Sequence, residues 1–281
     1  MPKLIHTAEE VRQSITIARA SGKTIGLVPT MGALHDGHLS LADAAKSECT
    51  FTIATIFVNP TQFAPNEDLA KYPRNLDADM QALARHDVDQ VFAPSPAEVY
   101  PEGFSTYVDP PEVAKPLEGK CRPGHFRGVC TVVLKLFNLI PADIAYFGEK
   151  DYQQLLVIRH MARDLNLPIE IRPCPTLREP DGLAMSSRNV YLNGDERQQA
   201  LALSNSLAMA NDLVGSGVTK SDAILQEMLG VLSNAGVENI DYIALVDPET
   251  LQDVPTITGP TQALVAAYVG KTRLIDNRRI G

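Results

Sequence analysis

Long apolar runs are missing from this sequence of 281 residues. No segment approaches the roughly 18 to 20 consecutive apolar residues that a membrane-spanning helix needs. The opening stretch, Met1 to His6, also lacks the apolar core of a secretory signal peptide. These two absences predict a protein with no membrane partner.

Cysteine is scarce and scattered along the chain. The four cysteines are Cys49, Cys121, Cys130 and Cys174, and their spacing matches neither a zinc site nor a disulfide framework. Isolated thiols are typical of proteins in a reducing compartment. The sequence therefore predicts a cytoplasmic location.

Basic residues are fewer than acidic residues in this chain. The chain carries 25 lysines and arginines against 34 aspartates and glutamates, which gives a net charge of −9. A nucleic-acid-binding protein normally presents a basic face to the phosphate backbone, so no nucleic-acid partner is expected. An anionic small substrate would instead need a local cluster of cations.

The first part of the chain alternates strand-like apolar runs with helical patterns. Strands are expected at Ile25–Val28, Thr50–Val58, Val88–Ala93, Asp143–Phe147 and Pro168–Pro173, and helices at Thr7–Ala20, Leu76–His86 and Val129–Ile140. Thr7 and Glu10 have the spacing of a capping box at the start of the first helix. The alternation predicts an α/β domain in residues 1–176, with a Rossmann-like doubly wound parallel sheet.

Residues 177–281 show a different order of elements. Two helices, Asn193 to Val214 and Thr219 to Asn234, precede three strands at Ile240–Val246, Ala263–Val269 and Thr272–Ile275. Glu196 and Asp222 each stand three residues after the first residue of a helix, the spacing of an N-terminal capping pair. This order predicts a smaller α+β C-terminal domain.

The stretch from Thr24 to Leu41 is the centre of the first domain. Its apolar run is expected to break at Pro29 and Gly32, and a helix follows whose N-terminus offers N–H groups and partial positive charge to a phosphate. His35 and His38 are three residues apart, so both rings face one side of a helical turn. A metal half-site or two solvated histidines are alternatives, but no Cys or carboxylate cluster nearby completes a metal site. The His-x-Gly-His pattern resembles that of nucleotidylyltransferases and class I aminoacyl-tRNA synthetases.

Polar residues follow two of the expected strands. Asn59 and Gln62 stand after the second strand, where the ligand crevice of an open parallel sheet lies, although Pro60 also fits a plain polar turn. Asp151 and Gln154 have the spacing of an ordinary capping pair. Lys150 has no such structural explanation, because a cation at a helix start is unfavourable unless an anion binds there.

Two further segments carry cations beside small or polar residues. Arg122, His125 and Arg127 precede or open an apolar helix, which favours an anion by charge and by helix dipole, or they form a solvated basic loop. Ser186-Ser187-Arg188 follows a Pro-Asp-Gly turn and could grip a phosphate, although loop serines are common in any protein.

Taken together, five stretches of the chain resemble the pantothenate synthetase (pantoate–β-alanine ligase) family. They are Pro29–His38, Phe57–Phe63, Arg122–Phe126, Phe147–Gln154 and Met185–Asn189, in the family's order and over essentially the whole chain. The resemblance implies that ATP, pantoate and β-alanine are converted to AMP, pyrophosphate and pantothenate through a pantoyl-adenylate. It also implies Mg²⁺, a cytoplasmic location and a homodimer. In such an enzyme, residues 1–176 would bind ATP and pantoate, and residues 177–281 would cover the active site.

The resemblance assigns roles to particular residues. The phosphate-handling set would be His35, His38, Lys150, Ser186, Ser187 and Arg188, with Met31, Gly148, Asp151, Leu177 and Met185 along the nucleotide. The pantoate set would be Gln62 and Gln154 with Asn59 nearby, and Arg122 would lie in the pantoate and β-alanine region. Mg²⁺ ligands are not readable from the sequence, and Asp79 is the one candidate.

The chemistry explains these residue types. A carboxylate acylates an amine poorly, whereas its mixed anhydride with AMP has a good leaving group, and forming that anhydride requires cations and N–H donors around phosphorus. Another small-molecule nucleotidylyltransferase would share His-x-Gly-His but would not need Gln62 and Gln154. A non-catalytic nucleotide-binding regulator would not need Lys150, and the size and charge of the chain disfavour an aminoacyl-tRNA synthetase.

Overall fold

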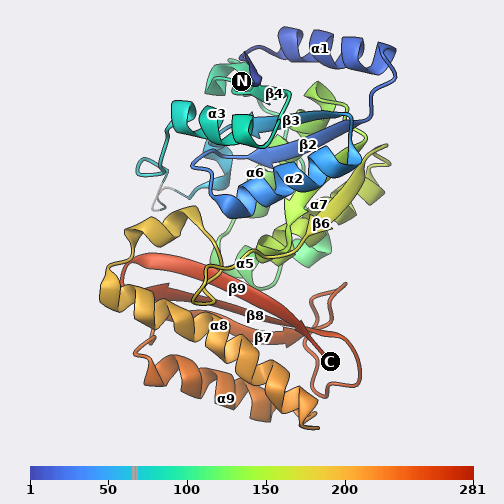
Figure 1. Ribbon diagram of the computed structural model, residues 1–281. Coiled ribbons are helices and arrows are strands. Elements are labelled where there is room, and N and C mark those ends of the chain that lie inside the picture. The colour runs from blue at the N-terminus through green and yellow to red at the C-terminus, as the bar shows by residue number, and fades with distance from the viewer. Residues whose placement is uncertain (65–66, 68) are drawn as a thin grey trace. The chain divides into compact units, whose positions relative to one another are not determined.

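The computed structural model describes residues 1–64, 67 and 69–281, which form two compact units. The first unit contains Met1–Glu149 and Gln153–Pro175, and the second contains Lys150–Tyr152 and Thr176–Gly281 (Figure 1). The short segment Lys150–Tyr152 thus belongs by its contacts to the second unit, although its neighbours on both sides belong to the first. The predicted division at residue 176 into domains of separate function stays a prediction.

The first unit is built on a parallel sheet, as predicted. Its described strands are β1 (Lys3–Ile5), β2 (Ile25–Thr30), β3 (Phe51–Ile56), β4 (Gln90–Phe92), β5 (Ile144–Gly148) and β6 (Glu170–Cys174), in the order β1-β4-β3-β2-β5-β6. From β2 the chain continues outward through β3 and β4 on one side, and later through β5 and β6 on the other side. The order therefore reverses between β2 and β5, and ligands of such sheets bind beyond the carboxyl ends of the strands at that point.

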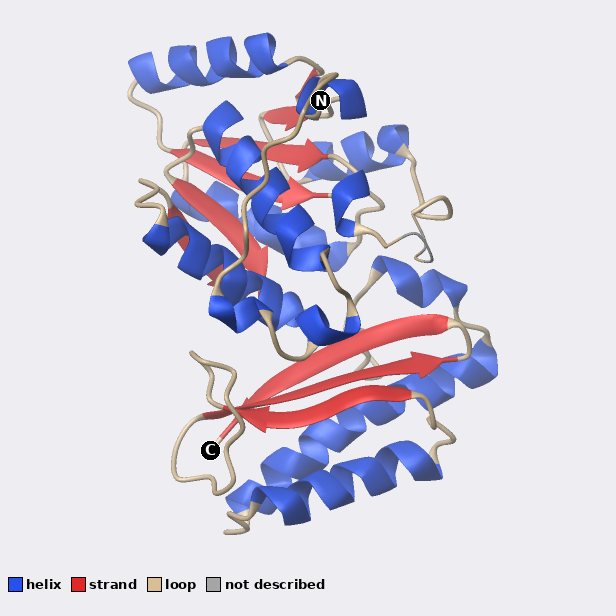
Figure 2. Cartoon of the chain, turned by 180° about the vertical axis from the view of Figure 1, so that it is seen from behind, coloured by secondary structure: helices blue, strands red, loops and turns tan. Residues whose placement is uncertain are grey.

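Helices cover both faces of this sheet (Figures 1 and 2). The helices before residue 176 are α1 (Ala8–Ala20), α2 (Asp36–Glu48), α3 (Leu76–Arg85), α4 (Pro96–Val99), α5 (Glu118–Cys121), α6 (His125–Leu139) and α7 (Tyr152–Asp164). Apolar side chains of α2 and α3, such as Ala42 and Leu83, pack with Val28 and Val91 of the strands in one buried cluster. At α1 the expected capping box between Thr7 and Glu10 is present. The Rossmann-like α/β class is confirmed.

The structure differs from the sequence prediction in three places. The strand β1 was not predicted, because three residues give too short a pattern. Pro29 does not end β2, which continues to Thr30. On the side that faces β5, β2 is paired only at Gly26 and Leu27, so no hydrogen bond to β5 is required at Pro29, which has no N–H to donate. The apolar helix begins at His125 rather than Val129, after Gly124 in a left-handed conformation.

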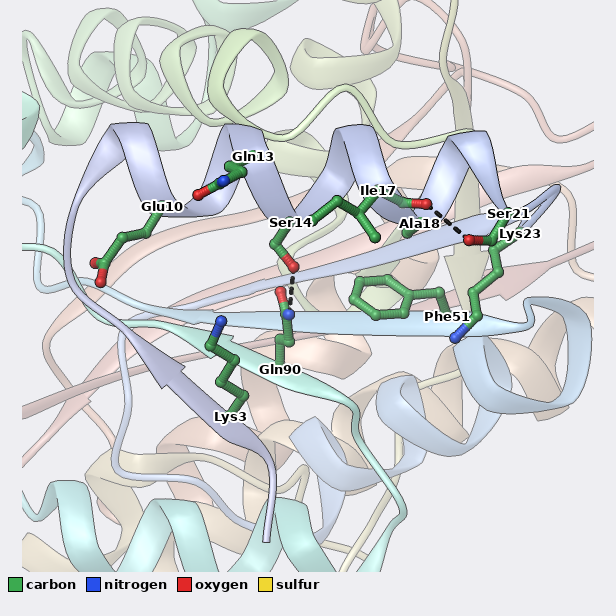
Figure 3. Close-up of a pocket in the computed structure, with 10 residues that line it drawn as sticks. All are labelled: Lys3, Glu10, Gln13, Ser14, Ile17, Ala18, Ser21, Lys23, Phe51 and Gln90. Atoms are coloured by element: carbon green, nitrogen blue, oxygen red, sulfur yellow. Dashed lines mark hydrogen bonds between the residues drawn. The ribbon is translucent and has the colours of Figure 1, made fainter.

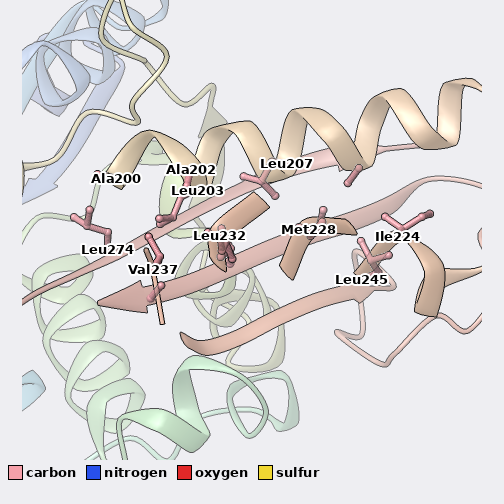
Figure 4. Packing of buried hydrophobic residues seen from close by; sticks show 14 of the residues in the cluster. Ala200, Ala202, Leu203, Leu207, Ile224, Met228, Leu232, Val237, Leu245 and Leu274 are labelled. Atoms are coloured by element: carbon pink, nitrogen blue, oxygen red, sulfur yellow. The ribbon is translucent and has the colours of Figure 1, made fainter. Parts of the chain in front are cut away.

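The second unit packs two helices on an antiparallel sheet. The helices are α8 (Gly194–Gly215) and α9 (Ser221–Asn234), and the sheet order is β7 (Ile240–Val246), β8 (Thr261–Val269), β9 (Thr272–Ile280). Figure 4 shows the buried cluster, in which Leu207 and Met228 are fully enclosed. Asn193 and Glu196 form the expected capping box, but the residue before α9 is Lys220 rather than Thr219, and β9 continues five residues beyond Ile275. Throughout the described part of the chain, no helix is long and apolar enough to span a membrane.

Candidate active site

One cavity of the first unit lies where the fold predicts a ligand crevice. Its volume is about 270 Å³, and its lining residues include Met31 and Gly32 after β2, Phe57 after β3 and Pro94 after β4. All four stand at the carboxyl ends of parallel strands, and Met31 and Gly32 follow β2, one of the two strands between which the order reverses. The predicted nucleotide residue Met31 thus borders a cavity.

A second cavity lies at the opposite ends of the same strands. It has a volume of about 420 Å³ and is enclosed by α1 together with Lys3, Lys23, Phe51 and Gln90 at or before the first residues of β1 to β4 (Figure 3). None of the predicted site residues lines it. Its place at the amino ends of the strands separates it from the nucleotide crevice of this fold.

The two motif histidines, His35 and His38, together cap the N-terminus of α2. His35 is the N-cap residue, and its Nδ1 accepts a hydrogen bond from the backbone N–H of Gly37 at 3.1 Å. The Nδ1 of His38 accepts from the backbone N–H of His35 at 3.4 Å, and the two ring centroids are 4.1 Å apart. Because both Nδ1 atoms act as acceptors, the neutral rings carry their protons on Nε2. Each ring is therefore oriented as a donor through Nε2, at a helix end that attracts phosphate.

Asp79 supports the turn that leads to these histidines. Its Oδ2 accepts from the N–H of Ala33 at 3.0 Å and its Oδ1 from the N–H of Leu34 at 2.8 Å. Gly32 and Ala33 both have positive φ, and for a residue with a side chain this backbone conformation needs outside support. Burial raises the pKa of the Asp79 carboxyl, and the two N–H donors oppose that rise.

Gln62 is held beside the same turn by Met31 and Asn59. Its Nε2 donates to Met31 Sδ at 3.1 Å, and its Oε1 accepts from Asn59 Nδ2 at 3.0 Å. Asn59 is 1% exposed, and its Oδ1 accepts from the hydroxyl of Tyr100 at 2.8 Å. Asn59 therefore orients Gln62, and the role of Tyr100 could not be read from a residue 41 positions away.

Arg122 and His125 do not form a solvated basic cluster. Arg122 makes two hydrogen bonds to the carboxylate of Glu67, at 2.7 and 3.0 Å. Burial, and then the positive charge of Arg122, lower the pKa of His125 to about 4, so its ring is neutral at pH 7. In that neutral form Nδ1 donates to the carbonyl of Gln62 and Nε2 accepts from Arg122. Arg127, the third member, pairs with Asp109 at 3.1 Å and is exposed.

The segment that joins β5 to α7 is divided between the two units. Gly148 ends β5 in the first unit, and Gln154 lies half-buried in α7 of the same unit. Lys150 and Asp151 belong to the second unit, where the ammonium lies 3.7 Å from the Asp151 carboxylate and the Lys150 side chain is 20% exposed. A single turn of 3-10 helix, Glu149–Asp151, precedes α7.

The predicted serine–arginine loop is held by a hairpin of the second unit. Met185 N–H donates to the carbonyl of Leu177 at 3.0 Å, and Arg178 bridges to Ala184. Ser186 then caps a short 3-10 helix by accepting from the N–H of Arg188 at 3.2 Å. The hairpin thus places Leu177 beside Met185, the start of the Met185–Arg188 stretch.

The part of the chain that the structure describes gathers no side chains into a protein-built metal site. Within residues 1–64, 67 and 69–281 there is no group of three or more His, Cys, Asp or Glu that could hold a metal ion. Mg²⁺ bound to a nucleotide takes most of its ligands from phosphates and water, so it needs no such group. Both oxygens of Asp79 already face N–H donors, a geometry that disfavours Asp79 as its ligand; that assignment stays a prediction.

Comparison with known proteins points to one family. A family model described as pantoate-beta-alanine ligase matches residues 3–279. The chain is 52% identical over 279 residues to the pantothenate synthetase of Thermotoga petrophila, covering 99% of this chain and 100% of that protein. It is 50% identical over 275 residues to that of Moorella thermoacetica, covering 98% and 97% of the two chains.

Solved structures agree with the sequence comparison. The crystal structure of pantothenate synthetase from Thermus thermophilus matches with a TM-score of 0.93 at 43% identity, covering 98% of each chain. A pantoate-beta-alanine ligase from Francisella tularensis, solved in complex with beta-gamma ATP and beta-alanine, matches with a TM-score of 0.81 at 38% identity. That match covers 99% of this chain and 97% of the other.

Proposed function

This chain belongs to the pantoate-β-alanine ligase family, and from that premise we propose that it joins (R)-pantoate to β-alanine through a pantoyl-adenylate. In the first step a pantoate carboxylate oxygen bonds to the α-phosphorus of ATP, and the bond to pyrophosphate breaks. In the second step the neutral amine of β-alanine attacks the acyl carbon, AMP leaves with the bonding electron pair, and the amine loses a proton. The products are pantothenate, AMP and pyrophosphate.

The observation that carries this proposal is the orientation of the histidine pair. Because Nδ1 of His35 and of His38 accepts a backbone N–H, each neutral ring presents an Nε2–H donor. Two preorganised donors at a helix N-terminus suit the negative charge that grows on the phosphate oxygens during adenylation. Lys150, Ser186, Ser187 and Arg188 complete the proposed phosphate set.

No protein nucleophile is needed for this chemistry, and the buried thiols are poorly suited to be one. The four cysteines form no disulfide, and Cys121 is the exposed one. Burial raises the pKa of Cys130 to about 12 and that of Cys174 to about 11. A thiol nucleophile acts as the thiolate, so these two side chains are inert near pH 7.

Recognition of pantoate is assigned to Gln62 and Gln154. The amide of Gln62 is oriented by Asn59 and by Met31, so it can bond a hydroxyl or carboxylate without first losing rotamer freedom. An analogue that lacks the hydroxyl would leave a polar group unpaired, which a site of this kind rejects strongly. The positive charge of Arg122 is balanced by the carboxylate of Glu67. We therefore assign Arg122 to shaping the β-alanine side of the pocket.

Mg²⁺ is proposed to bind together with ATP, held by phosphate oxygens and water, where it would neutralise part of the phosphate charge.

Four scattered cysteines without a disulfide support a cytoplasmic enzyme. The homodimer rests on the family resemblance.

Isotope exchange tests the proposal directly. The protein, supplied with ATP, Mg²⁺, pantoate and labelled pyrophosphate but no β-alanine, should move label into ATP. The reason is that a free pantoyl-adenylate forms reversibly when no covalent enzyme intermediate is required. Label that enters ATP only after β-alanine is added would show that the adenylate step does not occur alone, and label that never enters would remove the ligase assignment.

A further inference from the structure

Two adjacent polar residues in the last strand are buried. Asp276 is 3% exposed and Asn277 is 7% exposed, both within β9. Successive side chains of a strand point to opposite faces, and the register places Asp276 beside Val265 and Asn277 beside Leu264. Val265 belongs to the apolar core beneath the helices, so one polar residue faces that core and the other faces away from it.

Asp276 anchors the hairpin that leads to the predicted phosphate loop. Its two carboxylate oxygens accept from both terminal nitrogens of Arg178, at 2.7 and 2.9 Å. Arg178 also donates to the carbonyl of Gly182 at 3.1 Å, which fixes the tip of the hairpin. This bidentate geometry orients a guanidinium far more tightly than a single contact does. The strand residue therefore sets the position from which Met185 and its successors continue.

Asn277 anchors the other predicted catalytic segment. Its Nδ2 donates to the backbone carbonyl of Lys150 at 2.8 Å. Its Oδ1 accepts from Nε2 of Gln262, which is 2% exposed, and this contact fixes which end of the amide faces Lys150. The neighbouring hydroxyl of Tyr152 donates to the carbonyl of Pro248 at 2.8 Å, a second tie of the same segment to the second unit.

We propose that Asp276 and Asn277 are positioning residues for adenylation, which hold Lys150 and the hairpin before Ser186 in a fixed relation to each other. The proposal rests on the function proposed above. A displacement of about 1 Å of a catalytic group by a remote substitution can cost about a hundredfold in rate. Because Asp276 and Asn277 connect both segments to one strand, they prevent such displacements before ATP binds.

The test is a double-mutant cycle on pantoate-dependent adenylation with Lys150→Ala, Asn277→Ala and the combined variant. Lys150→Ala should lower the single-turnover rate by roughly a hundredfold to a thousandfold, as removal of one preorganised donor does. Asn277→Ala should lower the same single-turnover rate by roughly tenfold to a hundredfold, with the KM for pantoate unchanged. Because Asn277 acts through Lys150, the combined variant should be no slower than Lys150→Ala alone.

Asp276→Asn provides the second arm, with Asp241→Asn as its matched control. Asp241 is in the same sheet and pairs at 2.7 Å with Arg273, which lies outside both predicted catalytic segments. Asp276→Asn should slow adenylation roughly tenfold, whereas Asp241→Asn should keep the native rate even if its melting temperature falls. Normal rates in folded Asn277→Ala and Asp276→Asn, or fully multiplicative losses in the cycle, would overturn the proposal. An inactive native protein would instead refute the proposed function.

Discussion

At the scale of single residues, His125 shows how burial decides the charge of a side chain that looks basic in the sequence. The folded protein holds this histidine neutral, with a pKa of about 4 against an ordinary value of 6.5. The unfolded chain therefore binds one more proton than the folded chain between pH 6.5 and pH 4. Stability that is fully present above pH 6.5 is lost as the pH falls through that window, by roughly 3 kcal/mol in total.

The measurement is the free energy of unfolding by denaturant at a series of pH values between 4 and 7. His125→Asn removes the titrating ring, so this variant should lose roughly 3 kcal/mol less than the native protein over the window. His6 lies exposed near the N-terminus, and His6→Asn is measured alongside as the same substitution at an exposed position. Equal slopes for native protein and His125→Asn would show that the buried ring does not control the acid response.

At the scale of elements, α6 lies unusually close to the turn that carries Asn59 and Gln62. A Cβ on Gly128 would lie 2.7 Å from the backbone nitrogen of Gln62 and closer still to the carbonyl of Thr61. Backbone atoms cannot rotate away as a side chain can, so the turn itself would have to move. Gly128 is therefore needed for close approach of two elements rather than for flexibility.

Gly128→Ala tests this contact. Alanine usually stabilises a helix relative to glycine by about 0.5 to 1 kcal/mol, but here the clash should reverse the sign and weaken pantoate binding. Gly230 in α9 is the matched control, because nothing lies within 4 Å of a Cβ added there and Gly230→Ala should stabilise by the ordinary amount. Denaturant unfolding and calorimetric titration with pantoate measure the two effects. Stabilisation at both positions, with pantoate affinity retained, would contradict the packing argument.

At the scale of the whole molecule, the family resemblance predicts a homodimer. Light scattering coupled to gel filtration should give about twice the chain mass of 30.5 kDa at micromolar concentration. Since obligate dimers are held by apolar interfaces, the mass should persist at high salt. A mass of 30.5 kDa at every concentration would remove the dimer from the proposal.

The sequence alone determined the features that depend on neighbours in the chain. The capping boxes of Thr7 with Glu10 and of Asn193 with Glu196 join residues three apart, and both formed as expected. The alternation of strands and helices predicted the parallel sheet, and the motif histidines predicted a pair on one helical turn. Such features follow from short-range hydrogen bonds and from hydrophobic periodicity, which a linear pattern records directly.

Only the tertiary structure decided how the candidate site is supported. Asp79 lies 46 positions from Ala33 in the chain, and Asn277 lies 127 positions from Lys150. Their partners are backbone N–H and carbonyl groups, which every residue carries, so no side-chain pattern in the sequence marks these contacts. Likewise the charge of His125 depends on the burial that folding imposes, since a linear pattern shows which groups are present but not which of them lose water.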